Sequence, residues 1–248
     1  MVSKLGNFFK RFYLVLVFIF LYAPILTLVI FSFNESKTMG NWTGFSLKWY
    51  SALFNNDRIM AALFYTILIA VISSVIATII GTLASIGIHK MKGPKKALLL
   101  NINYIPVLNP DIVTGVSLMS LFIFLRIIID VEFGFMTMLI AHITFNIPYV
   151  ILAVLPKLRQ LPDNIEEAAL DLGATPLYTM FHVILPQIKP GIISGLLIAF
   201  TMSIDDFVIS FFTSGPGVTN LSIEIFSMAR RGIKPEINAL STLMFVSV

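Results

Sequence analysis

The chain has 248 residues, of which 57% are hydrophobic and 12% are charged, and it has a net charge of +4 and no cysteine. A soluble domain carries about 25% charged residues, so this chain has too few charges to cover a globule with a hydrated surface. The absence of cysteine excludes disulfides and cysteine-ligated metals, and the modest positive charge indicates membrane orientation rather than nucleic-acid binding. We therefore expect an integral membrane protein without a cofactor, in contact with membrane lipid.

Apolar stretches long enough to cross a bilayer as helices, about 20 residues each, recur along the chain. In chain order they are 12–33, 61–88, 97–125, 133–156 and 190–212. A further apolar stretch, 237–248, is too short to span and resembles a sixth span that the end of the sequence cuts short. Because lipid offers no hydrogen bonds to the backbone, we expect an all-α fold of about six transmembrane helices in one domain, residues 1–248.

Basic residues near the ends of the spans favour a cytoplasmic N-terminus. With that orientation the inside segments carry ten Lys and Arg residues and the outside segments carry seven. The short segment 89–96, with four lysines, is the strongest indication, whereas Arg230, Arg231 and Lys234 favour the opposite orientation.

The third apolar stretch is interrupted at Pro106 and at Asn109-Pro110-Asp111. These last three residues are typical of a helix start, with Asn109 as N-cap, Pro110 at the first position and Asp111 in the first turn. A break at membrane depth requires surrounding protein or a cavity.

The loop 157–189 has signals for two short helices outside the membrane. Asp163 and Glu166 have the spacing of a capping box, and Gly173 is placed to end the first helix in a left-handed conformation. The first helix would carry a narrow apolar face made of Ile165, Ala168, Ala169 and Leu172. Pro176 would start the second helix, which we expect to stop near Pro186. The pair is either a surface-lying loop or a docking surface for another protein.

The same loop reads Glu167-Ala168-Ala169, then Gly173 after three residues, then Val183-Ile184-Leu185-Pro186 after nine more. This pattern resembles the EAA signature of binding-protein-dependent ABC importer permeases with the MetI-like fold, with Val183 where the signature has Ile. The resemblance implies that the loop is a coupling helix that docks into a cleft on a cytoplasmic ATPase. It places these residues at that contact: Glu166, Glu167, Ala168, Ala169, Gly173 and Pro186.

Four further segments resemble the spermidine/putrescine permease group, in particular its PotC-type subunit: 44–50, 110–113, 203–210 and 235–239. The resemblance implies a non-catalytic, multi-pass subunit of the bacterial cytoplasmic (inner) membrane, which forms half of a translocation pathway. Its implied partners are a second permease (PotB type), a dimer of ATP-binding subunits (PotA type) and an extracytoplasmic polyamine-binding protein (PotD type). Related permeases for other solutes share parts of these segments, so another organic cation or an amino-acid derivative stays open as cargo.

Three acidic residues, Asp111, Asp205 and Asp206, lie within the apolar stretches. A charge at the bilayer centre costs roughly 2.5–3.5 kcal/mol on insertion scales, so the adjacent pair must face something other than lipid. Carboxylates beside an aromatic ring such as Phe207 suit a polyamine through ion pairing and cation–π attraction. We expect Asp205 or Asp206 to line the substrate pathway, although pairing with the partner permease or protonation would also explain them. Asp111 is a weaker candidate, because the helix start accounts for it.

The role of one further residue and two rival functions can be weighed against this interpretation. His142, within the fourth stretch, is expected to be a packed or hydrogen-bonded residue rather than a ligand. A stand-alone secondary transporter would need its own driving-ion site and often shows internal repeats, and neither is recognisable. A membrane enzyme would need a nucleophile–base pair or a metal cluster, and the sequence has no Walker A, HExxH or GxSxG pattern.

Overall fold

The structure, a computed structural model, describes residues 2–37, 41–162, 164–230 and 235–247. These residues are largely helical and contain no strand, apart from a β-bridge between Asn34 and Phe45. This confirms the expected all-α class. Five helical segments in the described part are long and apolar enough to cross a membrane: Phe9–Ser32, Asp57–Lys90, Asp111–Ile129, Phe135–Leu158 and Pro176–Asp205.

The chain divides into two compact units, which we describe separately. The first contains Met1–Ala61 and Glu224–Val248. Its main helices are α1 (Val2–Ser32), α2 (Lys48–Phe54) and α12 (Pro235–Ser247), and α12 contacts both α1 and α2. The Trp49 indole donates a hydrogen bond to the Asn34 carbonyl at 2.7 Å, which fixes α2 against the end of α1.

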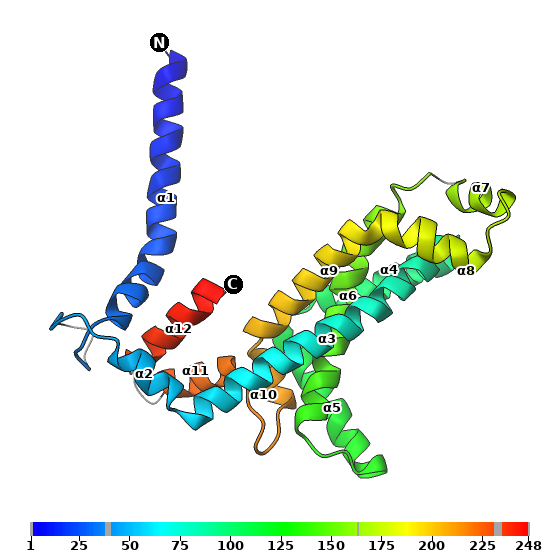
Figure 1. Cartoon of the computed structure of the whole chain (residues 1–248). Helices are drawn as coiled ribbons and strands as arrows, with labels where there is room; N and C mark the ends of the chain where they lie inside the picture. Colours follow the sequence, from blue (N-terminus) through cyan, green and yellow to red (C-terminus); the bar gives the residue numbers. More distant parts are fainter. Residues whose placement is uncertain (1, 38–40, 163, 231–234, 248) are drawn as a thin grey trace. The chain divides into compact units, whose positions relative to one another are not determined.

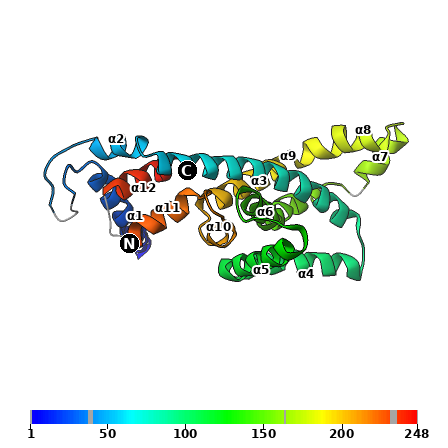
Figure 2. The ribbon, with the colours of Figure 1, turned by 90° about the horizontal axis from the view of Figure 1, so that it is seen from below.

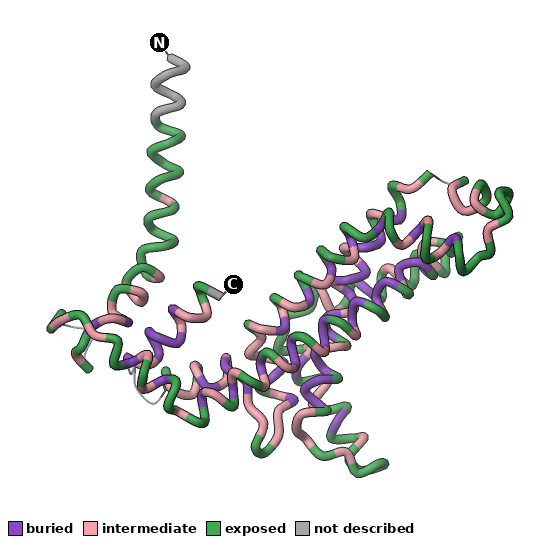
Figure 3. The backbone as a smooth tube through the Cα atoms, in the orientation of Figure 1, coloured by how far each residue is buried: buried purple, intermediate pink, exposed green. Residues whose placement is uncertain are grey.

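The second unit, Ala62–Ile223, is built around three long helices, α3 (Asp57–Lys90), α6 (Phe135–Leu158) and α9 (Leu185–Asp205). They run side by side in Figure 1 and Figure 2. Figure 3 shows that α6 is the most buried of them. The three helices share one apolar core, whose fully buried members include Ala77, Val150, Val154, Ile188 and Ala199.

Glycines allow these helices to approach closely, as small residues do in membrane bundles. A Cβ atom added to Gly81 on α3 would lie 2.8 Å from the Cβ of Val150 on α6. A Cβ atom on Gly195 of α9 would lie 3.2 Å from the Cγ1 of the same valine. Val150 therefore sits between two glycine surfaces and sets the spacing of the three helices.

The third apolar stretch is two helices, α4 (Pro94–Leu108) and α5 (Asp111–Ile129). The break lies where the sequence predicts it, but the predicted N-cap of the second helix, Asn109, is one residue too early. Pro110 is the N-cap and its carbonyl accepts from the Val113 amide at 2.9 Å, whereas no side chain caps α5. The expected interruption at Pro106 is wrong, because Pro106 lies inside α4.

The predicted stop near Pro186 is also wrong. A helical run continues from α8 (Pro176–Tyr178) through the π-helical segment η1 (Thr179–Ile184) into α9. A π-helix shifts the hydrogen bonds to residues five apart, and Pro186 then falls in the first turn of α9, where its missing amide is tolerated. The fifth span accordingly begins at Pro176 and ends at Asp205, instead of covering 190–212.

Gly81→Ala should destabilise the protein, because the new methyl group overlaps Val150 and overpacking costs about 1–3 kcal/mol. Gly87→Ala is the matched control on the same helix, since a Cβ atom there meets nothing within 4 Å. The control should leave stability unchanged or raise it by up to about 1 kcal/mol through helix propensity. Thermal unfolding of the purified protein in detergent measures both, and equal melting temperatures for the two variants would contradict the close packing.

Candidate functional site

The loop between α6 and α9 presents a short exposed helix, α7 (Ile165–Asp171). The expected cap Asp163 lies outside the described residues, and the N-cap position is Asn164. Gly173 has a φ of 85° and ends the helix in the left-handed conformation, as predicted. The expected apolar face is only partly covered, because Ile165 and Ala169 are half-buried whereas Ala168 and Leu172 are exposed.

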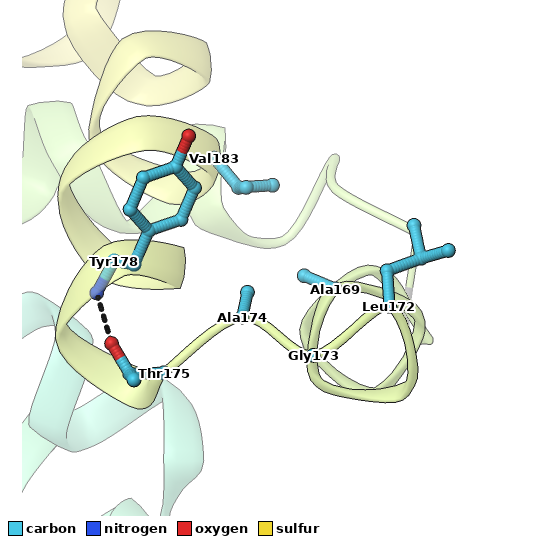
Figure 4. A pocket seen from close by; sticks show the side chains of 7 residues that line it. All are labelled: Ala169, Leu172, Gly173, Ala174, Thr175, Tyr178 and Val183. Carbon is cyan, nitrogen blue, oxygen red and sulfur yellow. Dashed lines mark hydrogen bonds between the residues drawn. The ribbon is translucent and has the colours of Figure 1, made fainter.

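A hollow of about 470 Å³ opens between α7 and the start of α8. Figure 4 shows Ala169 and Leu172 on one side, Tyr178 on the other, and the Gly173–Ala174 stretch between them. Small residues leave the hollow open, and Leu172, which also lines it, is 90% exposed. An open apolar recess next to an exposed leucine is typical of a surface that meets another protein.

The two adjacent glutamates of α7 have different surroundings. Glu167 and the neighbouring Ala168 are exposed to solvent. Glu166 is held by Lys90, the last residue of α3, with 2.6 Å between Nζ and Oε1. Pro186 lies exposed in the first turn of α9 and does not line the hollow.

The second group of predicted residues lies where α9 ends. The expectation of one helix through 190–212 is wrong, because α9 stops at Asp205 and α10 (Val208–Thr213) follows after two non-helical residues. Asp206 causes this break: its carboxylate accepts hydrogen bonds from the amides of Ile209 at 3.2 Å and Ser210 at 2.7 Å. A side-chain oxygen that binds these amides replaces the partners they would have in a continuous helix.

Asp205 and Asp206 are therefore not equivalent. The side chain of Asp206 is 7% exposed and occupied as a cap, whereas Asp205 is exposed. The Asp205 carboxylate interacts electrostatically with Asp206 and with Asp111, the exposed first residue of α5.

The fold thus gathers the three acids of the apolar stretches in one region. Phe207 is half-buried there, and its ring packs on Phe211 at 5.5 Å between centroids. Within the described part of the chain, no Lys or Arg forms an ion pair with Asp111, Asp205 or Asp206. The region is therefore rich in negative charge, and the described residues supply no lysine or arginine as a counter-ion.

A buried hydrogen-bond network bridges the break from α6. His142 is 1% exposed, and its Nδ1 lies 2.5 Å from the Ser203 Oγ on α9. Its Nε2 lies 2.9 Å from the Ser210 Oγ on α10 and 3.5 Å from the Asp206 Oδ2. Asn220 donates to the Ser210 Oγ at 2.8 Å and to the Asp206 carbonyl at 2.7 Å. The expectation that His142 is a hydrogen-bonded residue is confirmed.

The sequence analysis missed Ser203, Ser210 and Asn220 as members of this network. Ser203 and Ser210 stand two residues before Asp205 and four residues after Asp206, so their nearness to the acids was a usable signal. Asn220 had none, because its role depends on a loop that returns to the break.

Comparisons with known proteins agree with this architecture. Residues 77–247 match the family model described as "Binding-protein-dependent transport system inner membrane component". The chain is 44% identical over 241 residues to the "Putrescine transport system permease protein PotI" of Escherichia coli (strain K12), covering 95% of this chain and 85% of that protein. It is 38% identical to the "Spermidine/putrescine transport system permease protein PotC" of Haemophilus influenzae, covering 96% of this chain and 91% of that protein.

Among solved structures, a chain of a bacterial alginate ABC transporter, in complex with its alginate pentasaccharide-bound periplasmic protein, superposes with a TM-score of 0.76. The match covers 98% of this chain and 90% of that chain at 15% identity. A likeness at such low identity supports the fold.

Replacing His142 by leucine should lower the free energy of unfolding by about 1–3 kcal/mol, because the buried hydroxyl groups of Ser203 and Ser210 lose a partner. His182→Leu is the control: this histidine is exposed, and its loss should cost within about 0.5 kcal/mol. Thermal unfolding of the purified protein measures both changes. A His142→Leu variant as stable as the control would show that the hydrogen-bond network does not stabilise the junction between α9 and α10.

Proposed function

Since this chain belongs to the family of binding-protein-dependent transport system inner membrane components, we propose that it is a permease subunit of an ABC importer for polyamines, spermidine or putrescine. The observation that carries the proposal is the identity of 38–44%, over at least 95% of the chain, to permeases named for these two compounds. The chain is a multi-pass inner-membrane protein, and both of its units belong to one permease domain, residues 1–248.

In this proposal the chain is non-catalytic and forms half of the translocation pathway. A second permease of the PotB type forms the other half, a pair of PotA-type ATPases supplies the energy, and a PotD-type binding protein delivers the polyamine from outside. The N-terminus is cytoplasmic. The Lys90–Glu166 contact supports this orientation, because it puts the lysine-rich segment 89–96 at the same end of the second unit as α7.

We propose that α7 and the hollow beside it dock on the ATPase. The exposed Glu167 and Ala168 would meet the ATPase directly. The hollow lined by Ala169 and Gly173 would receive a protruding side chain, with Leu172 packed beside it. Pro186 would contribute at the margin, where α9 begins.

The acid cluster would carry the polyamine through the membrane. The exposed carboxylates of Asp205 and Asp111 would each attract a protonated amine, and Phe207 would offer an aromatic face to the stem between the amines. A cation placed between two carboxylates also relieves their mutual repulsion. Asp206 would act indirectly in this scheme, because its carboxylate oxygens already accept hydrogen bonds from the first turn of α10. These hydrogen bonds would keep the end of α9, and with it Asp205, in place.

Reconstitution of the complete transporter in liposomes tests this assignment. Asp205→Asn should lower putrescine uptake at subsaturating concentrations about tenfold or more, because a charge-assisted contact contributes about 1.5–3 kcal/mol. Basal ATP hydrolysis should persist, since α7 is unchanged. Asp130→Asn is the matched control: Asp130 is exposed at the end of α5 with a φ of 51°, a conformation that asparagine also adopts.

Normal uptake by the Asp111→Asn/Asp205→Asn double variant would contradict the proposed pathway. Failure of the wild-type complex to import putrescine and spermidine would contradict the proposed cargo.

A further inference from the structure

Glu166 and Glu167 are neighbours in the proposed ATPase-docking helix, yet only Glu167 is free to meet a partner. Glu166 is bound to Lys90, 76 residues earlier in the chain. We propose that the Lys90–Glu166 ion pair is a positioning contact that makes α7 and the end of α3 move as one body when the ATPase moves α7. This inference rests on the proposed function, because it assumes that α7 receives the motion of the ATPase.

The connectivity of the chain leaves α3 as the one of the three long helices that is not adjacent to α7 in the sequence. α7 follows α6 after six residues and leads into the helical run that becomes α9, so the backbone already links it to these two helices. No covalent link joins it to α3. The apolar core links α3 to α6 and α9, and the Lys90–Glu166 pair adds a direct contact between α3 and α7.

The end of α3 is arranged to leave Lys90 available. The Lys96 ammonium group donates to the His89 carbonyl at 3.1 Å and so satisfies one of the carbonyls at the end of the helix. Lys90 is the last residue of α3 and points its ammonium group to Glu166. Glu166 lies in the first turn of α7, where a negative charge is favoured by the helix dipole.

Packing beneath the pair is incomplete. A cavity of about 60 Å³ lies between α7 and the ends of α3 and α6, and its lining includes Ile86, Leu158, Ile165 and Ile184. Apolar contact alone therefore fixes the distance between α7 and α3 only loosely. The ion pair at the edge of this cavity, with its single short separation of 2.6 Å, supplies the missing constraint.

The pair is suited to positioning rather than to stability. The side chains of Lys90 and Glu166 are 50% and 35% exposed, and ion pairs this exposed contribute little to the stability of a fold. Variants of either residue should therefore fold and assemble, so that a loss of coupling can be measured in an intact complex.

The test is a charge exchange in the reconstituted transporter, with putrescine imported per ATP hydrolysed as the readout. Lys90→Glu and Glu166→Lys should each lower this ratio by about threefold to fivefold, the size expected for a contact of up to 1 kcal/mol. The double variant Lys90→Glu/Glu166→Lys restores the attraction and should return to within about twofold of wild type. Two controls accompany it: Lys92→Glu, an exposed lysine of the same segment, should have no effect, and Glu167→Lys should not be rescued by Lys90→Glu.

A second readout does not require cargo. Because the chain has no cysteine, spin labels can be attached at Gly87→Cys and Asp171→Cys, two exposed positions on α3 and α7. The distance between the labels should stay constant between the nucleotide-free and ATP-bound complex, and Lys90→Glu should broaden its distribution.

Unchanged ratios in both single variants, or a double variant no better than the worse single one, would overturn the inference. A distance between the labels that changes when ATP binds to the labelled complex with an intact Lys90–Glu166 pair would overturn it too. A different result would separate the two proposals. If the complex imports no polyamine, but ATP binding leaves the distance between the labels unchanged and Lys90→Glu broadens its distribution, the proposed cargo fails and the positioning contact stands.

Discussion

The hydrogen bonds that Asp206 accepts from the first amides of α10 allow the chain to interrupt a helix within its apolar region. Lipid offers no substitute partner, so a break of this kind needs an internal acceptor for every freed amide. The Asp206 carboxylate binds two amides and the Ser210 hydroxyl group, and Asn220 binds its carbonyl. The short helix α10 can then pack against α5 at Gly115, and Asp205 is left at the exposed end of α9.

Adjacent acids divide their roles in the same way at both ends of the second unit. In each pair, Asp205–Asp206 and Glu166–Glu167, one carboxylate binds within the chain and the other is exposed. Glu166 and Glu167 point about 100° apart on α7, and Asp206 leaves the helix that ends at Asp205, so the two acids of each pair meet different surroundings. The inner member supports the structure that presents the outer one.

The local features of this protein could be predicted from the sequence, and the long-range ones could not. The left-handed Gly173 and the helix start near Asp111 depend on residues a few positions away, and both are found, the second displaced by one residue. The helical path past Pro186 was mispredicted because a π-helical turn depends on the packing of η1 and has no clear residue signature. The contacts of His142 with Ser203 and of Lys90 with Glu166 join residues more than 60 positions apart, and only the tertiary fold brings them together.

The helical run from Pro176 to Asp205 has one mechanical consequence. Its 30 residues form a shaft about 45 Å long at 1.5 Å per residue, with the hollow beside α7 at one end and the intramembrane carboxylates at the other. Tilting such a shaft by about 10° about one end displaces the opposite end by about 8 Å. In the proposed function, a small displacement of this shaft at the ATPase-docking end would therefore move Asp205 by several ångströms at the other end.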